Sequence, residues 1–175
     1  NTSRHFPLRL IYPINDVFDT ERGTISLWLR KDGGEPAQAE LVRLVPEAVT
    51  VETVNAIVLA VGDKEPDVRL ERKDGEWVIA TAWNAPARTE KVESFVKSLS
   101  RLRGEFQSDT KDVFGDYGVK DDQALKIRIF VSGSDKPVAE LLVGKTRGND
   151  AVFVRQSDGE KVYSAGANLR SEVGL

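Results

Sequence analysis

The sequence predicts an α+β fold in which antiparallel β-hairpins and meanders form two lobes, with one amphipathic helix and a short second helix between them. Segments with the alternating apolar and polar residues of half-exposed strands occur on both sides of the centre of the chain. Asp-Gly turns separate several of these segments. The clearest helical pattern lies between the two groups, and this grouping favours α+β over a parallel doubly wound sheet.

The predicted strands differ in how far they are buried. NAIVLAVG (55–62) is apolar on both faces, as a central strand would be, whereas LKIRIFVSG (125–133) alternates. The sequence leaves residues 37–48 open between strand and helix. The predicted strands are residues 24–31, 55–62, 67–73, 76–81, 125–133, 138–144, 151–157 and 161–165. The turns predicted between strands are Asp32-Gly33-Gly34, Asp74-Gly75, Asp158-Gly159 and residues 132–137.

The strongest helical pattern covers residues 89–103. We expect Thr89 to cap its first turn and Gly104 to end it. A shorter helix is predicted over residues 111–117, ended by Gly118. The stripe at helical spacing on the longer helix consists of Val92, Phe95, Val96, Leu99 and Leu102.

We expect residues 1–175 to form a single α+β domain. Its β lobes would span roughly 1–85 and 120–175, joined by the helical segment 86–118. The 175 residues, 40% hydrophobic and 30% charged, are ordinary for a soluble globular protein. The first residue is Asn and no Met is present, so we expect a fragment of a longer or processed product. No apolar run approaches the ~20 residues of a membrane helix, so any anchor is expected upstream.

Several kinds of chemistry are excluded by composition. The absence of Cys excludes disulfides, thiolate metal sites and thiol nucleophiles, and it suits an oxidising compartment. No basic block stands out and the net charge is -3, so no nucleic-acid surface is predicted. His5 is the single histidine, and we expect it to be an ordinary residue near a chain end.

Two sequence patterns resemble known ligand-binding loops, but their residue spacing does not match those loops. Gly144-Lys145-Thr146 looks like the end of a phosphate loop, but position 139 is Ala where that loop needs Gly. We therefore expect a strand that runs into a polar turn. The acids Asp109, Asp112 and Asp116 lack the ligand spacing of a calcium loop. We expect no metal, no cofactor and no catalytic residues.

The tryptophans are the best candidates for recognition. Trp77 is expected to pack in the core, together with Phe95. The sequence leaves open whether Trp28 and Trp83 are buried or exposed, and an exposed indole would favour partner or glycan binding. The candidate partner-binding residues are Trp83, Asn84 and Trp28.

The order of motifs over about residues 49–170 resembles the bacterial domain-of-unknown-function family 4340. The motifs are LERKDGEWVIAT, Pro86 followed by the helix, Tyr117-Gly118-Val119, LLVGK and VFVRQSDGEKVYSA. Val119 stands where the family has Leu, and the usual proline soon after is missing. The resemblance implies structural roles: Gly118 and Gly144 for backbone geometry, Trp77 and Tyr163 for packing.

The resemblance also implies a cellular context. Such proteins usually carry an N-terminal membrane helix, with the domain on the periplasmic or cell-surface side, and are often encoded beside ABC-type exporter components linked to gliding motility. We therefore expect a non-enzymatic extracytoplasmic domain that binds a protein partner in a cell-envelope or transporter assembly. One alternative is a glycan- or small-ligand-binding module that uses an exposed Trp. A less favoured one is a carboxylate-dependent hydrolase, since no pair of acids is set apart by its context.

Overall fold

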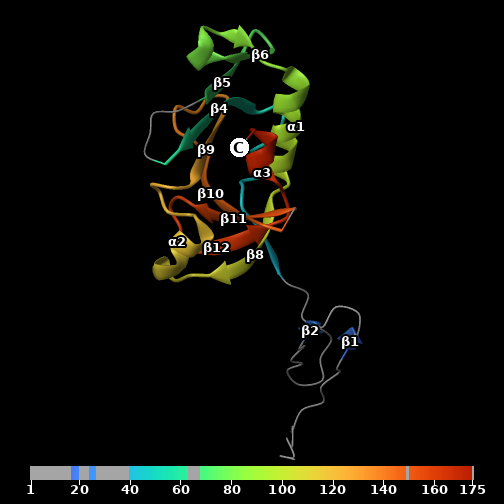
Figure 1. The fold of residues 1–175 in the computed structure, drawn as a ribbon. Helices are drawn as coiled ribbons and strands as arrows, with labels where there is room; N and C mark the ends of the chain where they lie inside the picture. The colour runs from blue at the N-terminus through green and yellow to red at the C-terminus, as the bar shows by residue number, and fades with distance from the viewer. Residues whose placement is uncertain (1–16, 20–23, 27–39, 63–67, 149, 175) are drawn as a thin grey trace, which may run out of the picture. The chain divides into compact units, whose positions relative to one another are not determined.

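The computed structural model describes residues 17–19, 24–26, 40–62, 68–148 and 150–174 (Figure 1). The chain divides into two units, Asn1–Ala39 and Glu40–Leu175, which are described separately. In the first unit β1 (Val17–Asp19) pairs antiparallel with β2 (Thr24–Ser26). β2 is the start of the strand predicted at 24–31, and the predicted turn at 32–34 lies outside the described residues.

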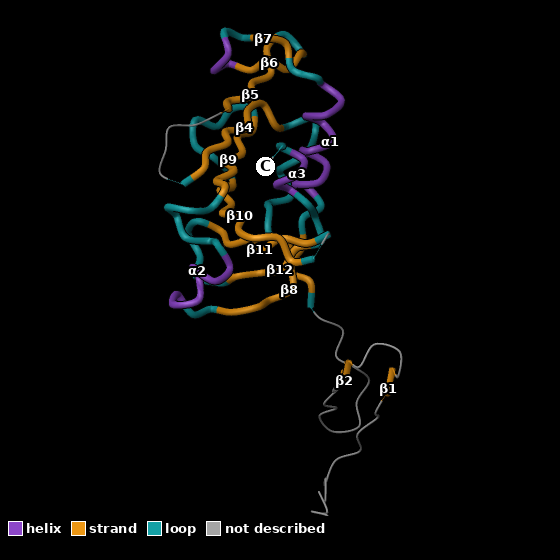
Figure 2. The backbone as a smooth tube through the Cα atoms, in the orientation of Figure 1, coloured by secondary structure: helices purple, strands orange, loops and turns teal. Residues whose placement is uncertain are grey.

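The described part of the second unit is built on a ten-stranded sheet in which all neighbouring strands are antiparallel (Figure 2). In spatial order its strands are β3 (Leu41–Arg43), β8 (Arg103–Ser108), β12 (Val162–Ala165), β11 (Ala151–Gln156), β10 (Ala139–Arg147), β9 (Leu125–Val131), β4 (Val54–Val61), β5 (Val68–Lys73), β6 (Glu76–Ile79) and β7 (Ala85–Pro86).

One strand pair joins the two halves of this sheet. β4 belongs to the first predicted lobe and β9 to the second, yet they pair directly, with Ile57 opposite Ile129. Strands from both predicted lobes therefore lie in one sheet. The mostly antiparallel build with few short helices is consistent with the α+β class, and the two-lobe layout is not confirmed.

The helices lie on both faces of the sheet. α1 (Thr89–Ser100) and α3 (Leu169–Glu172) are neighbours on one face (Figure 1). α2 (Phe114–Tyr117), preceded by the 3-10 turn η2 (Lys111–Val113), covers the other face near β11 and β12. Alternation along β11 shows this, since Val152 and Val154 join the main core whereas Phe153 packs with Phe114. No helix among the described residues has both the length and the apolar composition to cross a membrane.

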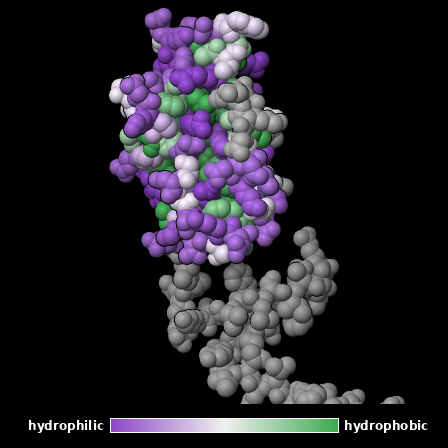
Figure 3. Space-filling model, turned by 90° about the vertical axis from the view of Figure 1, so that its left-hand side faces the viewer, coloured by the Kyte–Doolittle hydropathy of each residue, from purple (hydrophilic) through white to green (hydrophobic). Residues whose placement is uncertain are grey.

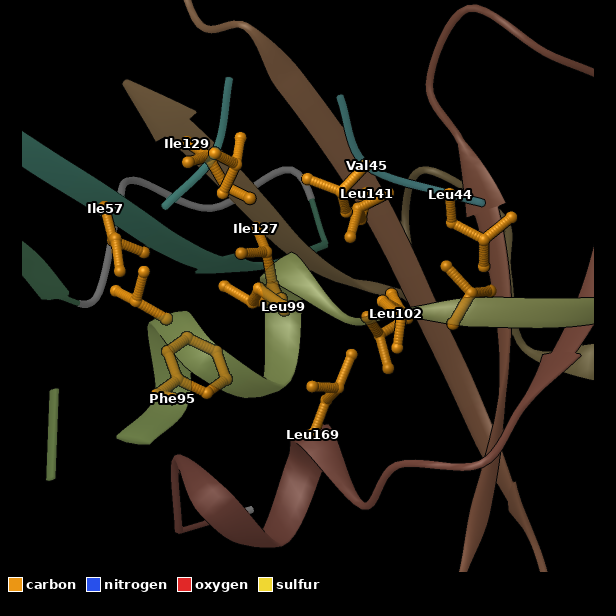
Figure 4. Packing of buried hydrophobic residues seen from close by; sticks show 14 of the residues in the cluster. Leu44, Val45, Ile57, Phe95, Leu99, Leu102, Ile127, Ile129, Leu141 and Leu169 are labelled. Carbon is orange, nitrogen blue, oxygen red and sulfur yellow. The ribbon is translucent and has the colours of Figure 1, made fainter. Parts of the chain in front are cut away.

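The main core lies between the sheet and the two helices on its face (Figure 4). Phe95 and Leu99 of α1 point toward Ile57, Ile127 and Leu141 of the central strands. Full burial of such side chains stabilises the fold by roughly 1.5–3 kcal/mol each, before entropy is counted. The whole predicted stripe of the helix is buried: Val92, Phe95, Val96, Leu99 and Leu102.

The ends of α1 differ from the prediction. Thr89 is the first helical residue and not the cap: Arg88 holds that position, and its carbonyl accepts from the amides of Lys91 and Val92. The helix ends at Ser100, and Gly104 lies in β8, a strand that was not predicted. A Cβ atom at Gly104 would lie 2.6 Å from Cβ of Tyr163, so Gly is needed there for strand packing and does not end the helix.

The predicted turns within the described residues and the second helix agree with the structure. Asp74 and Gly75 both have positive φ, 50° and 88°, in the two-residue turn between β5 and β6. Gly118 follows α2 with φ of 70°, a left-handed conformation that ends the helix. Within residues 37–48, the described part contains β3.

Charged side chains cover the face of β4 opposite α1. Val58 faces that side and is only 4% exposed, because Arg69 and Arg128 flank it on the neighbouring strands. Arg69 pairs with Glu71, and Arg128 with Glu140 at 3.2 Å. Figure 3 shows hydrophilic residues over most of this side of the second unit, with hydrophobic residues visible between them.

Candidate functional site

The turn between β6 and β7 presents a fully exposed tryptophan. After β6 the chain forms the 3-10 turn η1 (Ala80–Ala82), and Trp83 follows with 97% of its surface exposed. Trp83 and Asn84 both have positive φ, 53° and 57°. A left-handed conformation costs an L-residue other than Gly about 1–2 kcal/mol. The structure thus combines backbone strain with an indole that contributes nothing to the core.

Hydrogen bonds hold this turn at both ends. The Nζ of Lys73 donates to Oδ1 of Asn84 at 2.7 Å. The backbone amide of Arg69 donates to the hydroxyl oxygen of Thr81 at 3.2 Å. After the turn, the amide of Ala87 donates to the carbonyl oxygen of Trp77 at 2.8 Å. The exposed indole is therefore carried on a fixed backbone.

Trp77 has the opposite environment. It is 1% exposed and belongs to the main core, as predicted, in the same cluster as Phe95. The guanidinium of Arg72 lies 5.1 Å from the centre of its ring and 3.5 Å from the carboxylate of Glu93. The indole nitrogen of Trp77 is buried and has no hydrogen-bond partner among the described residues. Of the three candidate residues, Trp83 and Asn84 lie together in the exposed turn, and Trp28 lies outside the described residues.

A second candidate site lies where Gly118, in the turn after α2, packs against Gly144 of β10. A Cβ atom at Gly144 would collide with the carbonyl oxygen of Tyr117, and a Cβ at Gly118 would lie 3.0 Å from Cγ of Lys145. The turn after α2 thus rests directly on β10, which gives both glycines the backbone role that was expected. Beside this crossing lies a cavity of 480 Å³, lined by Gly118, Gln123, Gly144, Lys145, Thr146 and Arg170.

The cavity is not a phosphate loop. Residues 144–146 lie within β10, so the predicted strand continues past Gly144 to Arg147, where a polar turn was expected. The backbone of Gly144 is packed against Tyr117 and does not form an open nest of amides. Polar side chains, and not a glycine-rich loop, provide the donors of this cavity.

Arg155 is a buried charge that the sequence patterns did not predict. It is 5% exposed, and its Nη2 lies 2.8 Å from the carboxylate of Asp121. It also donates to the carbonyl oxygens of Val119 and Gly159, at 3.3 and 3.0 Å. Its guanidinium lies 4.7 Å from the centre of the Phe114 ring. These contacts join the segment after α2 to β11. The only signal in the sequence is one arginine in the apolar strand AVFVRQS.

Among the residues that the structure describes, three carboxyl groups have shifted pKa values, and they lie far apart in the sequence. The pKa of Glu71 is lowered by a hydrogen bond from Arg69, and that of Glu52 by a hydrogen bond from Thr50. Burial raises the pKa of Glu172, and a hydrogen bond from Ser98 opposes that effect. Within the described ranges, no group of three or more His, Cys, Asp or Glu side chains is placed to hold a metal ion. His5 lies outside those ranges.

Comparison with known proteins identifies the family. Residues 77–173 match the family model described as Domain of unknown function (DUF4340). Neither a curated protein nor a solved structure matches the chain significantly. The matched segment begins at Trp77 and includes both Gly118 and Gly144. Since the match covers more than half of the chain, this protein belongs to the DUF4340 family, a family of unknown function.

Proposed function

We propose that this domain is a non-enzymatic, protein-binding part of a cell-envelope or transporter assembly, and that the turn at Trp83 contacts the partner. The observation that carries the proposal is the fully exposed indole on a fixed backbone. Trp is the residue type most enriched among the side chains that dominate binding energy at protein interfaces. A turn held in one conformation loses little entropy when a partner orders it.

The neighbouring strand favours insertion of the side chain over addition of a strand. β7 is the edge strand at this end of the sheet and has two residues, Ala85 and Pro86. Pro86 has no amide hydrogen to donate to an added strand, and short edge strands with Pro resist such pairing. We therefore propose that a groove on the partner receives the Trp83 side chain.

The proposed location follows the family resemblance. The resemblance implies a membrane-anchored domain on the outer side of the cytoplasmic membrane, encoded near ABC-type exporter components. The absence of Cys supports an oxidising compartment. Fractionation of cells that express the full-length protein, with protease added to intact spheroplasts, tests the location. Protection of the domain from protease would contradict it.

Photo-crosslinking tests the contact itself. In the membrane-tethered full-length protein, an aromatic photo-crosslinking residue replaces Trp83, and in a matched control it replaces Asp135, an exposed residue of the β9–β10 turn. We expect one envelope protein to be crosslinked from position 83 and not from 135. Trp83→Ala should weaken binding of that protein by about tenfold or more. No crosslink from position 83, or equal crosslinks from both positions, would contradict the proposal.

The exposed indole also favours a second candidate, binding of a cell-wall glycan, because sugars stack on aromatic rings. Titration with soluble cell-wall fragments should then change the tryptophan emission of the unmodified protein and not that of Trp83→Ala. Trp28 and the buried Trp77 are present in both proteins, so a difference between the two titrations reports position 83. A flat titration excludes glycan binding at Trp83.

A further inference from the structure

The cavity beside the Gly118–Gly144 crossing has a lining that donates hydrogen bonds and carries positive charge. Four of its six lining residues have polar side chains: Gln123, Lys145, Thr146 and Arg170. None of the lining residues is acidic. The volume of 480 Å³ lies within the range of small-molecule sites. The lining therefore matches a small ligand that accepts hydrogen bonds and carries negative charge.

Arg170 is held in place at this cavity by the strand beneath it. Its Nη1 donates to the carbonyl oxygens of Val143 and Gly144, at 3.3 and 3.2 Å. Its Nε and Nη2 make no hydrogen bond to the described residues. A guanidinium that is already oriented loses little entropy when it binds a ligand through its remaining donors.

Lys145 provides the second charge. Its stem packs over Gly118, since its Cγ lies 3.0 Å from the place of a Cβ atom there. Lys145 forms no ion pair with a described carboxylate. Two cations that line one cavity without an acid repel each other. A bound anion offsets the free energy of this repulsion.

We propose that this cavity binds an oxyanion of a small molecule, a phosphate or a carboxylate group. Arg170 binds two oxygens with its planar donors, Lys145 supplies a point charge, and Thr146 and Gln123 donate further hydrogen bonds. The site differs from a nucleotide loop because side chains and not backbone amides hold the anion. It is independent of the partner contact proposed at Trp83.

Amide chemical shifts test the site in the full 175-residue chain. Two-dimensional nitrogen–proton NMR spectra are recorded during titrations with inorganic phosphate and with acetate, each at constant ionic strength with chloride as the balancing anion. We expect saturable shifts at the amides of Gly118, Gly144 and Thr146. Tighter binding of phosphate indicates a phosphate-bearing ligand, and tighter binding of acetate a carboxylate ligand. Shifts that stay linear for both anions, or saturable shifts located elsewhere, overturn the proposal.

A matched pair of variants separates the site from general charge effects. Lys145→Gln removes one charge at the cavity, and Lys136→Gln removes the same charge from an exposed turn between β9 and β10. We expect Lys145→Gln to weaken anion binding by about tenfold and Lys136→Gln to change it by less than about twofold. Both lysines are exposed, and unchanged melting temperatures verify folding. Equal weakening by the two substitutions, or none by Lys145→Gln, overturns the proposal.

Discussion

The backbone of Gly144 lies against the carbonyl oxygen of Tyr117, and no Cβ atom fits between them at position 144. This contact joins the turn after α2 to the middle of β10. It also places Gly118 and Lys145 side by side at the rim of the cavity. Two short motifs that are far apart in the sequence thus form one structural unit.

Gly144→Ala should destabilise the fold strongly. The added methyl group would collide with backbone, which cannot move aside as a flexible side chain can. We expect a loss of about 3 kcal/mol in the free energy of unfolding, measured by urea denaturation. Gly166→Ala is the control, because nothing lies within 4 Å of its Cβ position, and it should stay within about 0.5 kcal/mol of the unmodified protein. Equal stability of the two variants would contradict the close contact.

Trp83→Gly should stabilise the domain. Gly relieves a left-handed strain of about 1–2 kcal/mol, and its greater freedom in the unfolded chain offsets about 0.5–1 kcal/mol of that gain. We expect a net increase of about 0.5–1 kcal/mol by urea denaturation. Trp83→Ala keeps a Cβ atom and should change stability by less than about 0.5 kcal/mol. A marked loss of stability in both variants would show that the indole packs against the fold.

Replacing Trp77 should cost far less with Phe than with Ala. Trp77→Ala leaves a large cavity in the core and should cost about 4 kcal/mol. Trp77→Phe keeps most of the ring volume and removes a buried indole N–H that has no partner among the described residues, so we expect a cost of about 1–2 kcal/mol. Chemical denaturation of both variants provides the comparison. Similar costs would mean that the N–H is satisfied in solution.

Arg155 should matter more than the acid with which it pairs. Arg155→Ala removes the donor to two backbone carbonyl groups and a buried charge, with an expected cost of about 3 kcal/mol. Asp121 is 66% exposed, and Asn can still accept from Arg155, so Asp121→Asn should cost about 1 kcal/mol or less. Asp122→Asn, at the neighbouring exposed acid, should have no effect. Thermal melting ranks the three variants, and a cost for Asp121→Asn equal to that of Arg155→Ala would contradict this order.

Glu172 should make stability fall as pH rises from the mildly acidic range. Burial raises its folded pKa above the ordinary value of 4.5, so the folded state binds its proton more tightly than the unfolded state does. The contribution of Glu172 to the free energy of unfolding therefore decreases as pH rises through the interval from 4.5 to the raised folded pKa, and it is constant above that interval. Glu172→Gln should be the more stable protein at pH 7, with an advantage that disappears below pH 4.5. Urea denaturation at a series of pH values measures the difference, and a constant difference at every pH would argue against the shift.

The local elements could be predicted from the sequence, because their signals are local. Alternation located β5, β6 and β9 to β12 within a few residues, a run that is apolar on both faces located β4, and helical spacing located α1. The strand β8 was missed because Gly104 and the exposed Glu105 and Phe106 interrupt any alternation. The pairing of β4 with β9 leaves no local signal in the sequence. The residue pattern of each strand indicates a buried strand but does not specify which strand lies next to it.

The structure of the candidate site could be predicted less well from the sequence, for a different reason. Trp77 and Trp83 are six residues apart, so strand periodicity would place both on one face. The turn η1 and the left-handed residues Trp83 and Asn84 break that period, and one indole is buried while the other is exposed. The cavity at Gly118 and Gly144 depends on a contact across the fold, which spacing along the chain cannot reveal.

The pairing of β4 with β9 also determines the order in which the sheet can be completed. β4, β5 and β6 follow one another in the chain and pair in that order, but β4 gains its second neighbour only when residues 125–131 have been synthesised. During translation at about 5–20 residues per second, the edge of β4 that will later pair with β9 stays open for several seconds. Ile57 and Leu59 also lack their packing partners from β9 until then. The nascent chain therefore exposes an apolar strand edge, the kind of surface that chaperones cover and that favours aggregation.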